Sequence, residues 1–107
     1  MFGLFSKKEI DKAAAQDFWI WFAQREKWII ETYQSNSSEV IAAIDKNLKT
    51  VFPYFKKELE FQLGFHIGKG DFFFYHLGNR HLLHDAKILK DMMPPALAHH
   101  WDFIIEK

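Results

Sequence analysis

The sequence predicts a two-layer α+β domain, in which an N-terminal helical hairpin and a short third helix pack on an antiparallel sheet of three or four strands. Apolar residues recur with the 3.6-residue period of a helix in the first half of the chain, and the period changes to two from Glu58 onward. Glycine-containing turns then separate short aromatic segments. With 107 residues, the chain is expected to form a single domain over residues 1–107.

The first helix is expected to run from a start signal at Ser6 to about Tyr33. Ser6 and Glu9 have the spacing of a capping box, and neither Pro nor Gly interrupts the residues that follow. The apolar residues of this helix cover roughly 220° of its circumference, whereas a surface helix needs an arc only slightly above 100°. We therefore expect it to be covered on two sides, by the sheet and by a second element or another subunit. Formation of a homodimer through this helix would supply such a subunit.

A second helix is expected to begin at Asn36, which repeats the start signal together with Glu39, and to end before Pro53. Its apolar residues fall on a single face, in an arc of roughly 120°. The short polar connection at residues 34–38 predicts that the two helices form an antiparallel hairpin.

The second half of the chain is expected to be mostly extended. Residues 58–67 alternate between apolar and polar, as in a half-buried strand, and residues 71–77 return as a second strand after a glycine turn. Gly78-Asn79 is a two-residue hairpin signal, so residues 80–83 are expected to pair back as a short third strand. A short helix over residues 85–93 and a last strand over residues 101–106 complete the predicted domain.

Composition excludes several classes of function. Fourteen basic residues balance fourteen acidic ones, which disfavours nucleic-acid binding because that needs a basic excess. The chain has no Cys, so it has neither disulfides nor thiolate ligands, and a cytoplasmic location is expected. No apolar run is long enough for a membrane span. The apolar residues of segment 1–8 precede its lysines, unlike a secretory signal, and this segment is expected to fold over the domain or to fray, with a weak membrane-surface anchor as the alternative.

Two blocks of sequence resemble a small family of uncharacterised bacterial α+β proteins. The first is Phe18-Trp19-x-Trp21-Phe22 with Glu26 four residues beyond, and the second is the tail from Gly78-Asn79 through Met93-Pro94, Leu97 and Trp101. The family pattern has a small residue where this chain has Met93. The resemblance implies an α+β fold and brings no activity.

Two charged residues fall within the apolar arc of the first helix. Arg25 projects between Phe18 and Trp21, and Glu26 projects between Trp19 and Tyr33. A charge on a buried face must be paired or hydrogen-bonded. Glu26 is therefore either a general base or ligand contact in an aromatic pocket, or a structural group that caps backbone donors or bridges to a Lys, Arg or His of the sheet. The candidate ligand- or partner-binding residues are Arg25, Glu26, Trp19, Trp21 and Trp28.

The histidines suggest a second candidate site. In the predicted hairpin, His76 stands opposite His81, at a distance at which cross-strand side chains can share a metal. A zinc site needs three or four ligands, and the sequence offers only this pair with uncertain thirds, so solvated histidines are the competing interpretation.

No catalytic residues and no cofactor are expected, because the serines lie at helix caps or in a loop and no phosphate-binding glycine loop appears. The leading hypothesis is a non-enzymatic intracellular binding or accessory protein that acts through a protein surface, with an immunity-type protein as one version. The alternative is a small enzyme or ligand-binding domain that uses Glu26 and Arg25 with nearby histidines. Under the leading hypothesis, the partner would be another protein or a second copy of the chain.

Overall fold

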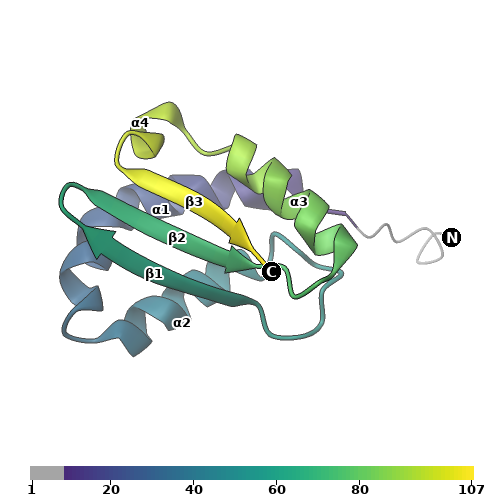
Figure 1. Cartoon of the computed structure of the whole chain (residues 1–107), viewed down its shortest axis with the longest axis horizontal. Coiled ribbons are helices and arrows are strands. Elements are labelled where there is room, and N and C mark those ends of the chain that lie inside the picture. The colour runs from purple at the N-terminus through teal and green to yellow at the C-terminus, as the bar shows by residue number, and fades with distance from the viewer. Residues whose placement is uncertain (1–8) are drawn as a thin grey trace, which may run out of the picture.

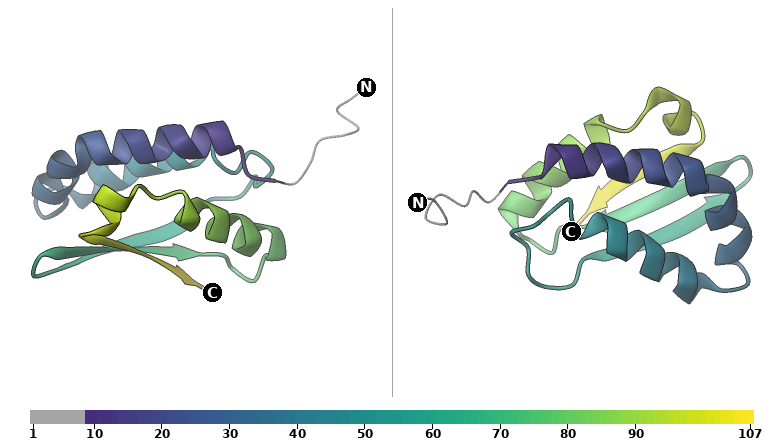
Figure 2. Two further views of the ribbon diagram at one scale, coloured as in Figure 1. Left: turned by 90° about the horizontal axis from the view of Figure 1, so that it is seen from above. Right: turned by 180° about the vertical axis from the view of Figure 1, so that it is seen from behind.

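The computed structural model describes residues 9–107 and has the predicted α+β class, with helices packed on a three-stranded sheet. The long helix α1 and its antiparallel neighbour α2 lie side by side over one face of the sheet (Figures 1 and 2). The remaining helices, α3 and α4, connect the last two strands (Figure 1). Among the described residues, no helix is both long and apolar enough to cross a membrane.

Helix α1 (Lys12–Tyr33) begins later than the capping-box pattern predicts. Glu9 and Ile10 are not helical, and Asp11 is the N-cap, whose carboxylate accepts a hydrogen bond from the backbone N–H of Ala14 at 3.0 Å. The predicted start at Ser6 is therefore wrong, although Ser6 itself lies outside the described residues, as does the rest of segment 1–8. Asp11 is the better cap because its backbone N–H also donates to the carbonyl of Val51, which anchors the start of α1 to the end of the hairpin.

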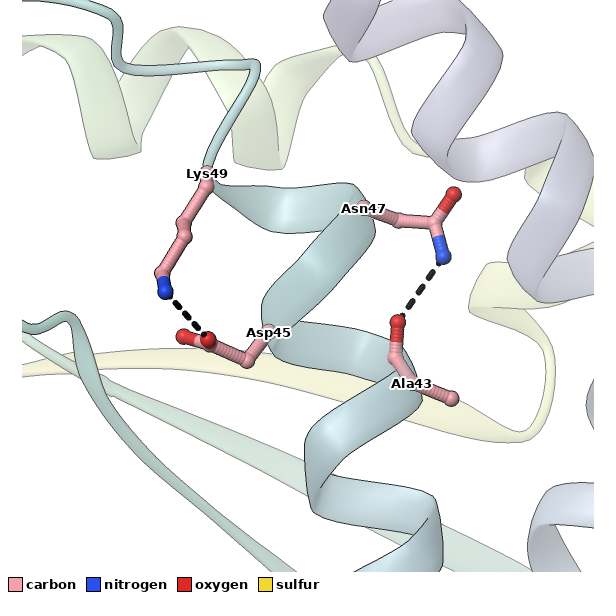
Figure 3. A network of polar contacts seen from close by, with 4 residues as sticks. All are labelled: Ala43, Asp45, Asn47 and Lys49. Atoms are coloured by element: carbon pink, nitrogen blue, oxygen red, sulfur yellow. Dashed lines mark hydrogen bonds and ion pairs between the residues drawn. The ribbon is translucent and has the colours of Figure 1, made fainter.

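Helix α2 (Ser37–Leu48) has the predicted cap, because Asn36 accepts from the backbone N–H of Glu39 at 3.2 Å. The helix ends at Leu48, whereas the sequence predicted that it would extend as far as Pro53. At this end the Lys49 ammonium lies 3.0 Å from Asp45, and the Asn47 amide donates to the carbonyl of Ala43 at 2.8 Å (Figure 3). These contacts stay within α2 and its C-terminal cap, so they stabilise the helix end locally.

The sheet has the order β1-β2-β3. Strands β1 (Glu60–His66) and β2 (Lys69–Tyr75) form the predicted antiparallel hairpin, in which His66 pairs with Lys69 across a two-residue turn. The turn is Ile67-Gly68, so β2 begins two residues before the predicted strand over residues 71–77. Strand β3 (Trp101–Glu106) has the predicted bounds, but it runs parallel to β2, and Phe72 pairs with Phe103. The prediction of a wholly antiparallel sheet is therefore wrong in this one pairing.

The predicted short strand at residues 80–83 is also wrong. Helix α3 (Arg80–Asp91) begins there, because the Asn79 side chain accepts from the backbone N–H of Leu82 and caps the helix. Helix α3, which begins five residues before the helix predicted over residues 85–93, and the short helix α4 (Pro95–Ala98) then carry the chain back to the starting end of β2. A crossover of this kind places β3 parallel to β2, which a hairpin cannot do.

The core lies between the helices and the face of the sheet that they cover. Alternate residues along β2 point toward this face and are buried. Among them, Phe72 contacts Phe103 and Phe61 in nearly parallel stacks. The indole of Trp19 on α1 is buried against Phe103, and its N–H donates to the carbonyl of Leu89 on α3. On the opposite face of the sheet, side chains such as that of Gln62 are exposed or half-buried.

Candidate functional site

A cleft of about 380 Å³ opens where the C-terminal half of α1 meets the β1–β2 turn and the start of β3. Its lining residues come from these three places in the fold. They are Ile30, Gln34, Phe65, His66, Gly68, Lys69, Gly70, His100 and Trp101. The aromatic and aliphatic side chains form apolar walls, and the polar side chains stand among them, which is the composition typical of a small-ligand site.

Trp101 forms one wall of the cleft and is held from two sides. Its ring lies so close to the backbone of β2 that a Cβ on Gly70 would be 2.7 to 2.9 Å from three of its carbons. The ring also meets Phe65 edge-on, with centroids 5.6 Å apart. Glycine is therefore required at position 70, because any side chain would displace the indole from this wall.

Glu26 lies directly behind Trp101 and His100. Its Oε2 accepts a hydrogen bond from the indole Nε1–H of Trp101 at 2.8 Å and contacts Nε2 of His100. Glu26 does not line the cleft, so its carboxylate fixes two residues that do. A carboxylate that holds one imidazole nitrogen in this way orients the ring and leaves the other nitrogen available, an arrangement found in general bases and in ligand-binding histidines.

The two other basic residues of the cleft are held in a similar way. Nε2 of His66 lies 3.2 Å from Asp71, and Nζ of Lys69 lies 3.4 Å from Asp102. Both carboxylates project from the face of the sheet opposite the helices and, like Glu26, do not line the cleft. By strand alternation, His66 and Lys69 project from the same face as these carboxylates, so each of the two bases lies beside an acid at the rim of the cleft.

The aromatic residues that the sequence singles out on α1 lie elsewhere. Trp19 is buried in the core, and Trp21 and Trp28 are partly buried against it. Arg25 is exposed, with its guanidinium carbon 4.7 Å above the ring centroid of Trp28. Arg25 does not line the cleft, because it points about 100° around the helix from Glu26. Among the five candidate residues, Glu26 is the one that makes polar contacts with cleft residues, namely Trp101 and His100.

The hairpin that was expected to bring His76 and His81 face to face does not exist. His76 follows β2, and its Nδ1 accepts from the backbone N–H of Gly78, whereas His81 lies on α3 near the ring of Tyr54. Across residues 9–107, no group of three or more His, Asp or Glu side chains is placed to hold a metal ion.

A buried acid lies outside the cleft, on α3. Asp85 accepts a hydrogen bond from the hydroxyl of Tyr54 at 2.6 Å. Burial raises the pKa of Tyr54 well above its ordinary value, and the hydrogen bond to Asp85 and the negative charge of Asp85 raise it further. This pair joins the segment after α2 to α3, which is a structural role.

Most cleft residues were missed at the level of sequence. His100 and Trp101 adjoin the last strand, and nothing in their spacing indicates that they meet Glu26, 75 residues away from Trp101. The one signal in the sequence was Glu26 itself, a charge on an apolar helix face. That signal led to the hypothesis of a bridge to a histidine. Glu26 does contact a histidine, His100, but this residue lies just before β3 and not in the sheet.

Comparison of the chain with protein families, curated proteins and solved structures finds no match. The resemblance based on the Phe18–Phe22 block and the C-terminal tail gains no support from that comparison. Functional inference therefore depends on the geometry of the cleft.

Proposed function

We propose that the protein is a non-catalytic binding protein that holds a small ligand in the cleft between α1, the β1–β2 turn and the start of β3. The observation that carries this proposal is the way Glu26 fixes His100 and Trp101 side by side at the cleft wall. Groups held in place before binding lose little freedom when a ligand arrives, which favours affinity. The cysteine-free composition supports a reducing, cytoplasmic setting for this activity.

The size of the cleft also supports a ligand. Its volume of about 380 Å³ falls within the range of ordinary small-molecule sites. Its apolar walls, Ile30, Phe65 and Trp101, supply burial, and Gln34 with the three bases supplies polar contacts that can fix orientation. Among residues 9–107, no serine or threonine lines the cleft, so nucleophilic catalysis by a hydroxyl has no support from these residues.

NMR titration of the ¹⁵N-labelled full chain with small neutral and charged aromatic fragments tests this function. We expect saturable shifts of the Trp101 indole N–H and of backbone amides around Gly70. Ile30 and Ile20 provide a matched pair, because both are exposed isoleucines on α1 and only Ile30 lines the cleft. Ile30→Ala should weaken binding by roughly three- to tenfold, whereas Ile20→Ala should leave it unchanged. Fragments that leave the cleft signals unmoved would refute the proposal.

A protein partner is the second candidate, and one observation favours it. Ile67, at the tip of the β1–β2 hairpin beside the cleft, is fully exposed and has no role in the core. Such a side chain suits insertion into a partner, as in an immunity-type protein or a second copy of the chain. Ile67→Ser should then abolish partner capture or self-association, measured by affinity capture and sedimentation. Leu77→Ser, at an exposed leucine in a different loop, is the control.

A further inference from the structure

We propose that a second surface of the protein, separate from the cleft, binds membranes whose lipids carry negative charge. This surface has two parts, which are the lysines of the α2–β1 connection, residues 49–59, and the apolar residues of segment 1–8. Ligand binding in the cleft does not depend on this surface, so the two proposals can fail separately.

The α2–β1 connection concentrates basic side chains. Lys49, Lys56 and Lys57 line one hollow of about 340 Å³, and all three are exposed. The hollow brings Lys49, at the start of the connection, together with two lysines from its far part. One acid, Glu58, shares the lining, so the lysines leave an excess of positive charge there.

The contacts of these lysines leave their charges available to anions. Nζ of Lys49 lies 3.0 Å from Asp45, but 57% of the Lys49 side chain is exposed, and an exposed pair of this kind is weak. Nζ of Lys56 donates to the carbonyl of Pro53 at 2.8 Å, which uses one of its three donors and neutralises no charge. Within residues 9–107, no acid lies at ion-pair distance from Lys56 or Lys57.

This positive charge is local to the connection. All fourteen acidic residues of the chain lie within residues 9–107, whereas two of the fourteen basic ones, Lys7 and Lys8, precede them. The described part of the chain therefore holds more acids than bases. Residues 45–58 reverse that balance, with four lysines and two acids. Clustered lysines are attracted to the surface of a membrane that contains anionic lipids.

Segment 1–8 supplies the apolar part of the proposed surface. It lies outside the described residues, but its composition is plain from the sequence: the apolar residues Met1, Phe2, Leu4 and Phe5 precede Lys7 and Lys8. Aromatic and aliphatic side chains followed by lysines suit the boundary between lipid tails and headgroups. An apolar segment or a basic patch alone gives marginal, reversible binding, whereas the two together give stable binding.

The fold joins the two parts at one end of the molecule. The backbone N–H of Asp11 donates to the carbonyl of Val51 at 2.9 Å, and Val51 belongs to the α2–β1 connection. The start of α1 accordingly lies beside this connection (Figure 2). Segment 1–8 is joined to the domain at Glu9, and the four residues from Phe5 to Glu9 span at most about 14 Å. Phe5 and the lysines can therefore contact the same membrane.

Co-sedimentation of the full chain with lipid vesicles tests the lysines. Vesicles of phosphatidylcholine are compared with vesicles in which about one third of the lipid is phosphatidylglycerol. We expect roughly tenfold tighter binding to the anionic vesicles, lost as salt rises from about 0.1 M to about 1 M. The double variant Lys56→Gln/Lys57→Gln should weaken this binding by roughly tenfold. The control Lys87→Gln/Lys90→Gln, at two exposed lysines of α3, should leave it unchanged.

A second pair of variants tests the apolar part. Phe5→Ser should weaken binding to the anionic vesicles by roughly three- to tenfold, because the phenyl ring no longer enters the interface. Ile20→Ser, at an exposed isoleucine of α1, should leave binding unchanged. Circular dichroism of each variant confirms folding.

Four results would overturn the proposal. They are failure to bind anionic vesicles, equal binding to both kinds of vesicle, unchanged affinity in the double lysine variant, and unchanged affinity in Phe5→Ser. Binding of duplex RNA without binding of vesicles would also overturn it, since the lysines would then serve a nucleic acid. Each of these results would leave the proposed function of the cleft standing, because the fragment titration tests that function independently.

Discussion

The indole N–H of Trp101 donates to Oε2 of Glu26 across 2.8 Å, joining two residues that are 75 positions apart. The bond links the C-terminal half of α1 to the first residue of β3. Because Trp101 is 2% exposed, its N–H has little access to water and needs this acceptor. The helix and the last strand thus meet at a fixed polar contact inside an otherwise aromatic region.

Removal of the Glu26 acceptor should destabilise the protein. Glu26→Ala leaves the indole N–H without a partner and should lower the free energy of unfolding by about 1–3 kcal/mol. Glu26→Gln keeps an acceptor oxygen and should lose less. Urea denaturation followed by circular dichroism measures both, with Glu31→Ala, an exposed glutamate of the same helix, as the control. Equal stability of Glu26→Ala and wild type would contradict the expected role of the bond.

Gly70→Ala should be among the more damaging small substitutions in the sheet. The added Cβ would lie within 2.9 Å of the Trp101 ring, which is itself packed and cannot easily move. We expect a loss of about 1–3 kcal/mol in the free energy of unfolding, and a shifted Trp101 indole signal. Gly64→Ala is the matched control, since its Cβ would be 3.4 Å from the edge of the Phe73 ring. Comparable losses in the two variants would argue against a specific contact between Gly70 and Trp101.

Leu77→Gly should stabilise the protein. Leu77 has a φ of 58°, in the left-handed region that a leucine adopts only at a cost, and half of its side chain is exposed. Glycine relieves this strain, and we expect the free energy of unfolding to rise by about 0.5–1 kcal/mol. Leu77→Ala keeps the Cβ and should bring no such gain. Thermal denaturation of the three proteins decides the point, and a less stable glycine variant would show that the leucine side chain matters more.

Asn79 should behave as a helix cap. Its side chain accepts from the backbone N–H of Leu82 at 3.0 Å, so Asn79→Ala should cost about 1 kcal/mol in the free energy of unfolding. Asn79→Asp retains an acceptor and should cost much less. Urea denaturation measures the difference, and hydrogen exchange should show faster exchange at the start of α3 in the alanine variant. Equal stability of the two variants would exclude a capping role.

Tyr54 should make the protein sensitive to alkali. Burial and Asp85 raise the pKa of Tyr54 in the folded state, so the unfolded chain loses the phenolic proton first. The resulting stability is present below pH about 10 and is lost as the pH rises beyond that value. Urea denaturation between pH about 7 and about 11 should therefore show a decline that is weaker in Tyr54→Phe. Tyr75→Phe, which removes a long hydrogen bond to Gln62, is the control and should retain the wild-type slope.

Local patterns predicted much of the fold. The alternation in β1, the Asn36 cap and the final strand are all visible in the sequence, because each depends on neighbouring residues. Gly78-Asn79 misled for a physical reason: the same dipeptide suits a tight hairpin turn and a helix start, and Asn79 caps α3. The error at residues 80–83 then concealed the parallel pairing of β3, since only a helical crossover permits it.

The site was less accessible to sequence reasoning than the fold. Glu26 was recognisable because a charge interrupted an apolar face. Its partners His100 and Trp101 were not, because their approach depends on the parallel alignment of β3 beside β2. The sequence did not predict the role of Gly70 either, because a glycine near a turn is common. Its importance follows only from the position of the Trp101 ring against it.

The parallel crossover also bears on how the protein folds. The α1–α2 and β1–β2 hairpins close short loops, whereas β3 can pair with β2 only by closing the longer segment that contains α3 and α4. Closure of the longer loop costs more chain entropy and is expected to be the slow event. Trp101 arrives with that last strand, so the binding wall would form only at the end of folding. A chain in which only the two hairpins had formed would lack this wall, so the proposed ligand would bind the completed fold alone.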